Sequence, residues 1–369
     1  MSLRERISRM IRLAGPMPLA EFMHVALNDP QSGYYSRQPA IGAKGDFITA
    51  PEVSQLFGEL IGIWCVSAWK SLGSPPAFAL VEAGPGHGTL MADILRTAQR
   101  FASFNSAISV HLIEASPAMV ARQRERLANA GHRIHWHTAL QTLPAMPTLF
   151  IANELLDVLP FRQYVKSGRN WLENCVGLDA NGKLAFMLGA GQIDPALLPD
   201  GHQHQPDGSV FETSLAREAF VQELCENLLK REGAALLIDY GHMKSGFGDT
   251  FQAVQAHKPA DPLADPGSAD LTSHVDFEPL RQLADHAGIA GSAIATQGEF
   301  LLAMGLLERA GLLGSTAGND RREQIRNEVE RLAGPGQMGS LFKVMGLWHG
   351  QHGKASPDLP PFAMPGTGH

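Results

Sequence analysis

The stretch AFALVEAGPGHGT, residues 77–89, decides the fold class of this 369-residue chain. Residues 77–84 form a mostly apolar run that ends at Gly84, which is typical of a buried strand. Further glycines follow at every second position, and LMADILRTAQRF (90–101) continues at once with helical spacing. Because glycine has no Cβ, the backbone of such a turn can approach a ligand closely. The stretch therefore predicts a strand, a glycine turn and a helix, with a ligand site at the turn.

The alternation of strands and helices continues along the chain. ISVHLIEAS (108–116) predicts a second strand, and PAMVARQRERLANA (117–130) predicts a helix that begins with proline, where the missing N–H is tolerated. RIHWH (133–137) is a third short strand, and TLFIANELL (148–156) begins as a fourth. This order favours a doubly wound α/β fold, with a mostly parallel sheet and helices on both faces.

The flanking regions predict additions to this domain. Two short helices over 1–30, a loop over 31–51 and a helix over 52–70 come before it, and FRQYVKSGRNWLENCVGLDANGKLAFML reads as an antiparallel β-hairpin insertion. Later helices are expected over 212–231, 277–288, 300–313 and 319–333, strands over 233–241 and 340–348, and a long loop over 242–270. The expected divisions are N-terminal helices and loop (1–75), the first part of the α/β domain (76–160), an inserted region (161–211), the remainder of the domain (212–350) and a disordered tail (351–369).

Composition argues against several classes of function. The chain has 30 basic and 37 acidic residues, a net charge of −7 and no basic block, so we expect no nucleic-acid partner. No apolar run reaches the ~18 residues that a membrane helix needs, so we expect no membrane insertion. The three cysteines, Cys65, Cys175 and Cys225, are far apart and form no CxxC motif. This pattern indicates a reducing compartment. The histidines of HRIHWH (132–137) lack HExxH spacing, so we expect no metal site.

The glycine turn itself narrows the choice of ligand. The dinucleotide fingerprint needs a third glycine at the position that Thr89 occupies, and no lysine follows to complete a P-loop. The sequence reads instead as an acidic residue followed by alternating glycines: Glu82, Gly84, Gly86 and Gly88. A carboxylate at this point repels a pyrophosphate, but it suits a cofactor that carries an ammonium group and a sulfonium.

A second acidic residue strengthens this interpretation. Glu114 ends the second strand, 26 residues after Gly88, where a carboxylate can accept hydrogen bonds from both hydroxyls of a ribose. On its own, Glu114 could equally interact with the dipole of the following helix. Together, Glu82, the three glycines and Glu114 predict an S-adenosyl-L-methionine site.

The end of the fourth strand supplies candidates for the chemistry. Methyl transfer is an in-line displacement, so an enzyme must hold a nucleophile close to the methyl carbon. A carbon nucleophile needs a base, and a guanidinium needs carboxylates that orient it. The candidate catalytic residues are therefore Asn153, Glu154 and Asp157. The alternative, which stays open, is that Glu154 and Asp157 cap a following turn.

Several stretches spread over residues 15–348 resemble the MidA family, whose mitochondrial members serve as assembly factors for respiratory complex I. They are GDFITAPEVSQLFGELIGIW (45–64), VEAGPGHGTLMADILR (81–96), NELLDVLPFRQ (153–163), ADLTSHVDF (269–277), TQGEFLLAMG (296–305) and MGSLFKVM (338–345). The resemblance implies a class I methyltransferase (Rossmann-like) fold with an inserted region and S-adenosyl-L-methionine as cofactor. In the mitochondrial branch it also implies symmetric dimethylation of an arginine on a matrix-side complex I subunit.

The resemblance also implies roles for particular residues. It assigns Glu82, the glycines and Glu114 to the cofactor, and it implies that Asp46, Thr49 and Pro51 fold over the cofactor. Asn153 and Glu154 would stand at the strand end nearest the methyl group, although the position of Asn153 can be histidine in the mitochondrial pattern. The residues that would line the substrate side are Asp270, Thr272, His274 and Asp276, although HVDF is also typical of a helix start.

The sequence therefore favours an enzyme that methylates an arginine, with a complex I subunit as the protein substrate. Its short N-terminus favours a bacterial, cytoplasmic member, while the related eukaryotic branch acts in the mitochondrial matrix. Two alternatives stay open: an assembly chaperone that binds the cofactor without essential catalysis, and a small-molecule methyltransferase. A homodimer is also possible.

Overall fold

The computed structural model describes residues 1–36, 49–350 and Phe362. The chain forms two compact units, each assembled from separate segments. The first unit comprises Met1–Phe47, Asp157–Ala219 and Lys244–Asp276. The second unit comprises Ile48–Leu156, Phe220–Met243 and Phe277–His369. Asp46 and the expected tail, apart from Phe362, lie outside the described residues.

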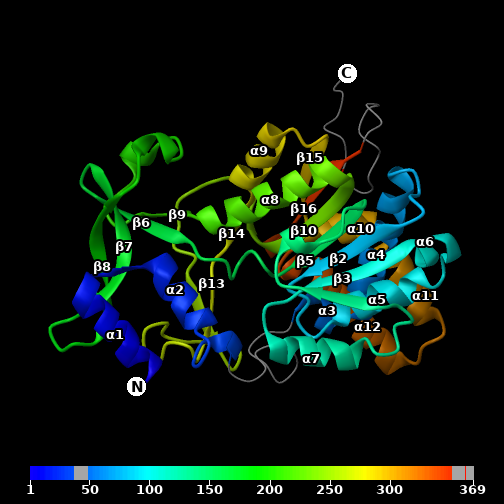
Figure 1. The fold of residues 1–369 in the computed structure, drawn as a ribbon, viewed down its shortest axis with the longest axis horizontal. Coiled ribbons are helices and arrows are strands. Elements are labelled where there is room, and N and C mark those ends of the chain that lie inside the picture. The colour runs from blue at the N-terminus through cyan, green and yellow to red at the C-terminus, as the bar shows by residue number, and fades with distance from the viewer. Residues whose placement is uncertain (37–48, 351–361, 363–369) are drawn as a thin grey trace. The chain divides into compact units, whose positions relative to one another are not determined.

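The second unit is built on the sheet that the strand–helix alternation predicts (Figure 1). Its strands are β2 (Phe78–Ala83), β3 (Ile108–Ile113), β4 (Ile134–His137), β5 (Thr148–Asn153), β10 (Gly233–His242), β15 (Gly291–Thr296) and β16 (Phe342–His349). They lie in the order β15-β16-β10-β5-β2-β3-β4. The pairs from β4 to β10 are parallel, and β16 pairs antiparallel with both β10 and β15. The predicted doubly wound, mostly parallel α/β fold is confirmed.

The strand order reverses at the pair β2 and β5, the point at which open α/β sheets bind their ligands. Ala83 of β2 is in register with Ile113 of β3 and with Ala152 of β5. The carboxyl ends of these three parallel strands therefore meet at one edge. That edge brings together the residues that end or follow the strands: Glu82, Glu114 and Asn153.

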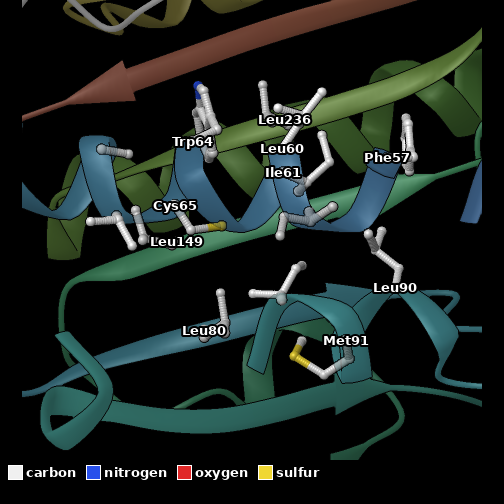
Figure 2. Packing of buried hydrophobic residues seen from close by; sticks show 14 of the residues in the cluster. Phe57, Leu60, Ile61, Trp64, Cys65, Leu80, Leu90, Met91, Leu149 and Leu236 are labelled. Carbon is white, nitrogen blue, oxygen red and sulfur yellow. The ribbon is translucent and has the colours of Figure 1, made fainter. Parts of the chain in front are cut away.

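Helices cover both faces of this sheet, as alternating strand residues show. Leu149 and Ile151 of β5 belong to the same core cluster as helix α4 (Gln55–Ser71). The ring of Phe150 points the other way and lies 6.1 Å from that of Phe220, on helix α8 (Leu215–Arg231). Figure 2 shows the packing on the α4 side, where side chains of the helix meet those of the strands: Phe57, Leu60, Ile61, Trp64 and Cys65 with Leu80, Leu149 and Leu236.

The sequence explains why α4 forms where it does. Ser54 is its N-cap and accepts a hydrogen bond from the Leu56 N–H at 3.2 Å. The apolar residues then recur at the spacing of one helical face. The other helices of the unit are α3 (Ala50–Val53), α5 (Thr89–Ala98), α6 (Ala102–Ala107), α7 (Pro117–Arg126), α9 (Phe277–Ala287), α10 (Gln297–Ala303), α11 (Leu306–Ser315), α12 (Asn319–Ala333) and α13 (Met338–Leu341).

The C-terminal part differs from the expectation at one helix, and it contains one strand that was not expected. The helix expected over 300–313 is divided into α10 and α11, because Gly305 takes a left-handed φ of 88° between them. The strand β15 was not expected, since GSAIAT has no apolar alternation. It forms because β16 offers an antiparallel partner along all six residues.

The first unit is mainly antiparallel β-structure with two N-terminal helices. Its elements are α1 (Leu3–Ala14), β1 (Met17–Pro18), α2 (Leu19–Asn28), β6 (Arg162–Ser167), β7 (Asn170–Leu178), β8 (Leu184–Gln192), β9 (Val210–Thr213), β11 (Gln252–Gln255), β12 (Lys258–Pro259), β13 (Asp270–Thr272) and β14 (Val275–Asp276). The predicted hairpin is confirmed, because β6 and β7 pair antiparallel up to Ser167 and Asn170. The loop expected over 242–270 contains the short strands β11 and β12, which are too brief to leave a periodic pattern.

The N-terminal helices pack against this β-structure. Ser2 and Glu5 form a capping box at the start of α1. Buried apolar residues from all three segments of the first unit form one cluster, which includes Ile7, Phe22, Phe161, Val176 and Leu271. Across the described parts of both units, no helix combines the length and apolarity needed to cross a membrane.

Candidate active site

The glycine turn follows β2 and adopts a backbone that requires its glycines. Gly84, Gly86 and Gly88 have φ values of 64°, 50° and 78°, all in the left-handed region. The Gly84 N–H donates to the Ile113 carbonyl at 3.1 Å, which fixes the start of the turn against β3. A Cβ at position 84 would lie 3.0 Å from Leu155 Cδ1. At Gly84 a side chain therefore meets both backbone strain and a close contact with Leu155.

Glu82 is buried in β2 and serves the next helix as well as the site. The N-cap of the following helix α5 is Gly88, which has no side chain to cap the helix, and the Met91 N–H in the first turn of α5 favours the charged form of the Glu82 carboxyl group. Its Oε2 atom is buried without a hydrogen-bond partner among the described residues. Burial raises the pKa of Glu82 to about 8. A buried carboxylate of this kind gains stability when a cationic group pairs with it.

Glu114 lies directly after β3 with both carboxylate oxygens held. Oε1 accepts a hydrogen bond from the Ser116 N–H at 2.8 Å, and Oε2 accepts one from Gln123 Nε2 at 3.0 Å. Burial raises the pKa of this carboxyl group, and the two hydrogen bonds oppose the rise. Each oxygen can accept a further hydrogen bond, so the carboxylate can still receive a pair of hydroxyls. The contact with Ser116, the N-cap of α7, shows that a structural role coexists with that capacity.

Gln123 on α7 belongs to this site and was not predicted. Its side chain is fully buried, and its Nε2 atom donates both to the Gly86 carbonyl at 2.8 Å and to Glu114. Its Oε1 atom accepts from Trp136 Nε1 at 3.0 Å. The available sequence signal is the spacing of Val120, Gln123 and Leu127, which places a polar residue on an otherwise apolar helix face.

The end of β5 turns sharply at Glu154. This residue has a φ of 52°, and its N–H donates to the Ile238 carbonyl at 2.9 Å. Its Oε1 atom accepts hydrogen bonds from Asn153 Nδ2 at 3.1 Å and from the Ala50 N–H at 3.3 Å. A non-glycine residue keeps such a conformation only where its surroundings hold it, which is common at functional sites.

Asp239 is the group that holds the residues after Glu154, and it was also not predicted. It is fully buried in β10, and its two oxygens accept hydrogen bonds from the Leu156 and Tyr240 N–H groups, each at 2.9 Å. The signal for it is a lone carboxylate inside the apolar strand GAALLIDYG (233–241).

The two other candidates at this strand end have different surroundings. Asn153 is 9% exposed, and its Oδ1 atom is buried without a hydrogen-bond partner in the described part of the chain. Asp157 lies in the first unit, where its carbonyl accepts hydrogen bonds from the Ser273 N–H at 3.1 Å and from Arg217 Nη2 at 3.3 Å. A joint action of Asp157 with Glu154 stays a prediction.

The start of α3 adjoins the candidate residues of the second unit. Thr49 is its N-cap, and Pro51 is buried in its first turn. Besides the hydrogen bond from Ala50 to Glu154, the Glu52 Oε1 atom accepts one from Thr89 Oγ1 at 2.6 Å. Residues 49–53 therefore contact both the end of β5 and the helix after the glycine turn.

The residues expected on the substrate side all lie in the first unit. Asp270 Oδ1 accepts a hydrogen bond from the Tyr35 hydroxyl at 3.2 Å, and Asp276 Oδ2 accepts one from Ser245 Oγ at 2.5 Å. Thr272 is buried, and the His274 carbonyl accepts from Arg217 Nη1 at 2.7 Å. Their role toward a substrate stays a prediction.

The described histidines and cysteines show no metal-binding arrangement. Within the described ranges, no group of three or more histidine, cysteine or acidic residues is placed to hold a metal ion. His111 and His137 contact one another at 2.8 Å, and burial lowers the pKa of His111 to about 4. The three cysteines are free thiols in buried positions.

The fold and the glycine turn together define a class I methyltransferase, and comparison with known proteins supports this. Residues 60–294 match the family described as "Putative S-adenosyl-L-methionine-dependent methyltransferase". A relative from Drosophila melanogaster, named "Protein arginine methyltransferase NDUFAF7 homolog, mitochondrial", is 35% identical over 95% of this chain and 85% of its own length. The human relative of the corresponding name is 36% identical over 91% of this chain and 81% of its own.

A solved structure agrees with these relatives. The crystal structure of a "likely methyl transferase" from Burkholderia thailandensis, bound to S-adenosyl-homocysteine, has a TM-score of 0.81 and 27% identity, and covers 94% of this chain and 92% of its own. The chain therefore belongs to this S-adenosyl-L-methionine-dependent methyltransferase family, and S-adenosyl-L-methionine is its cofactor. The resemblance to the MidA family is confirmed.

The residues present fit this cofactor. The glycine turn leaves room for close approach, the Glu82 Oε2 atom offers an unpaired buried acceptor to a cationic group, and Glu114 offers a fixed carboxylate to two hydroxyls. These are the chemical features that the cofactor's sulfonium, ammonium and ribose require.

Proposed function

We propose that this enzyme transfers a methyl group from S-adenosyl-L-methionine to the guanidinium of an arginine in a protein. The observation that carries the proposal is the identity of 35–36% over more than nine-tenths of the chain to relatives named protein arginine methyltransferases. The carboxylate of Glu154, held at the end of β5, supports it from the structure.

The proposed cofactor residues are Glu82, Gly84, Gly86, Gly88 and Glu114, with Asp46, Thr49 and Pro51 as the covering segment. When bound, the cofactor supplies an electrophilic methyl group on its sulfonium. Glu114 binds the ribose hydroxyls, and Glu82 stabilises the positive charge. The left-handed backbone of the glycine turn, which favours residues without a Cβ, supports a close approach of the cofactor to this backbone.

The proposed catalytic residues are Glu154, Asn153 and Asp157. A carboxylate that faces a guanidinium forms charge-assisted hydrogen bonds and draws the positive charge toward the nitrogens it contacts. The remaining nitrogen is then the better nucleophile, and the carboxylate fixes its approach. Asn153 carries a further acceptor, because its buried Oδ1 atom has no hydrogen-bond partner among the described residues.

For the acceptor, we propose a subunit of respiratory complex I and symmetric dimethylation as the product, on the strength of the family resemblance. We place the reaction in the bacterial cytoplasm, and we keep a homodimer as a possible assembly. The finer proposals can fail while arginine methylation stands, because a different protein could carry the arginine.

The test is transfer of a labelled methyl group to complex I subunits, followed by mass spectrometry of the labelled residue. We expect methylarginine with the wild-type enzyme. Glu154→Gln should abolish transfer and leave the affinity for S-adenosyl-homocysteine nearly intact, because Glu154 is assigned to the guanidinium. Glu125→Gln, on the exposed face of α7, is the control.

The outcomes separate the alternatives. Equal loss of transfer and of cofactor affinity in Glu154→Gln would count against the orienting role. Label on a residue other than arginine, or on a small molecule, would overturn the proposal. A Gly86→Val variant that binds no cofactor but still supports complex I assembly would favour a chaperone.

A further inference from the structure

We propose that Gln123 is a positioning residue of the cofactor site, which fixes the ribose-binding carboxylate of Glu114 relative to the glycine turn. The proposal rests on the cofactor location given under Proposed function.

The contacts of Gln123 reach three of the cofactor candidates. Its Nε2 atom donates to the Gly86 carbonyl at 2.8 Å and to Glu114 Oε2 at 3.0 Å. Its Cγ atom would lie 3.7 Å from a Cβ at Gly88, so the side chain also packs beside the last glycine of the turn. One buried side chain thus connects the backbone after β2 with the carboxylate after β3.

The amide can adopt only one orientation. Both Nε2 hydrogens have acceptors, and Oε1 accepts a hydrogen bond from Trp136 Nε1 at 3.0 Å. A flipped amide would place its oxygen against the Gly86 carbonyl and the Glu114 carboxylate, and its NH₂ group against the Trp136 N–H. Each flipped contact is repulsive, and the side chain is fully buried, so no water can replace a lost partner.

The fixed amide determines the orientation of Glu114. The Ser116 N–H holds one carboxylate oxygen and Gln123 holds the other, which defines the carboxylate plane. The lone pairs of Glu114 that are not used in these two hydrogen bonds then point in a fixed direction. Two adjacent ribose hydroxyls need such a fixed pair of acceptors. Without Gln123, one oxygen would lose its partner and the carboxylate could rotate.

The charged groups around Gln123 define what a substitution should do. Glu114 faces it directly, while Arg124 lies over the Trp136 ring at 4.5 Å. Arg122 contacts His87 at 3.4 Å, and Arg126 donates to Thr89 at 3.1 Å. Each of these arginines is therefore engaged with another group. A carboxylate at position 123 would be repelled by the Glu114 carboxylate and the Gly86 carbonyl, and it would be tolerated only in its protonated, neutral form.

The test is calorimetric titration of the full chain with S-adenosyl-homocysteine at pH 5.5 and pH 8, with each variant compared with wild type at the same pH. Gln123→Glu should weaken binding at least tenfold at pH 8 and recover most of the affinity at pH 5.5. Gln123→Met, which removes the hydrogen bonds without adding charge, should weaken binding by a similar factor at both pH values. Gln99→Glu, an exposed matched control, should bind as wild type.

Three results would overturn the proposal. The first is wild-type affinity in both Gln123 variants. The second is the same loss for Gln123→Glu at both pH values, which a merely structural defect would give. The third is wild-type affinity in Glu114→Ala, because the site assignment would then be wrong. Should Gln123→Glu not fold at pH 8, Gln123→Met decides. No methyl acceptor is present, so failure of the proposed arginine chemistry would not affect the result.

Discussion

Three carboxyl groups lie at the ends of strands β2, β3 and β5, and each also interacts with the backbone of a neighbouring helix. The Met91 N–H in the first turn of α5 favours the charged form of Glu82, Glu114 accepts a hydrogen bond at the start of α7, and Glu154 accepts one from the start of α3. In each case the carboxyl group interacts with the backbone at or near the start of a helix. The sequence left open whether these carboxylates act at a helix terminus or bind a ligand. A role at a helix terminus does not exclude ligand binding.

Glu82 gives a prediction on pH and stability. Its pKa in the folded protein, about 8, lies above its usual value of 4.5. The folded state then binds more protons than the unfolded state between these values, so the free energy of unfolding falls as pH rises through this window. Glu82→Gln does not titrate. In the cofactor-free protein its stability relative to wild type should therefore increase from pH 5 to pH 8.5, by ~4 kcal/mol at most.

Urea unfolding of wild type and Glu82→Gln at both pH values measures this difference. A stability difference that is the same at pH 5 and pH 8.5 would show that the Glu82 carboxyl does not titrate in this window. The exposed Glu125→Gln serves as the control and should show no pH-dependent difference.

Some of these residues could be predicted from the sequence and others could not. Glu82 and Glu114 end strands with clear apolar patterns, so their common edge follows from the rules of parallel sheets. Gln123 and Asp239 are distant in sequence from the groups they hold, and their importance depends on hydrogen bonds that only the folded chain defines.

Among the elements, the glycine turn has three residues with a left-handed φ, which a residue with a Cβ adopts only at a cost. Gly84→Ala must adopt a φ of 64°, which costs about 1–2 kcal/mol for a residue with a Cβ, and its Cβ would press on Leu155 at 3.0 Å. Leu155 lies in the turn after β5, at the sheet edge where we propose that the cofactor binds. We therefore expect at least a tenfold loss of cofactor affinity. The measurement is calorimetric titration with S-adenosyl-homocysteine.

Gly73→Ala is the matched control. Gly73 has a similar φ of 82°, but a Cβ there would meet no described atom within 4 Å. It should show the backbone cost in stability and bind the cofactor as wild type. Equal affinity of the two variants would show that the turn tolerates a side chain, which would weaken the assignment of the cofactor to it.

The elements that could be predicted are those with a long apolar pattern. The strands β2, β3 and β5 and the helix α4 follow directly from theirs. The strand β15 exists because β16 offers it a partner, and the break between α10 and α11 depends on the φ of Gly305. Such tertiary and single-residue effects leave little signal in a window of sequence.

On the scale of the whole molecule, the chain leaves and re-enters each unit twice. The strand order of the second unit is the one that alternating strands and helices favour. The contribution of residues 244–276 to the first unit could not be predicted, because strands of two to four residues carry no periodicity.

Arg217 joins the later segments of the first unit and gives a prediction on its stability. The side chain is 5% exposed and donates to the carbonyls of Asp157, Ser273 and His274 at 2.7–3.3 Å, and to Ser273 Oγ at 2.6 Å. Lysine cannot reach these acceptors together, so Arg217→Lys should lower stability by about 2–4 kcal/mol. Cofactor affinity should persist, since the cofactor residues with described structure lie in the second unit.

Urea unfolding measures this effect, with Arg169→Lys as the exposed control. Equal midpoints for the two variants would show that the guanidinium contacts do not stabilise the first unit.

We expect S-adenosyl-L-methionine to lie across the carboxyl ends of β2 and β3. A crystal structure of this protein with S-adenosyl-homocysteine tests it most directly. We predict that the ribose hydroxyls contact the Glu114 carboxylate and that the backbone of Gly84 to Gly88 runs along the ligand. A ligand bound elsewhere, or a ribose without contact to Glu114, would contradict the account.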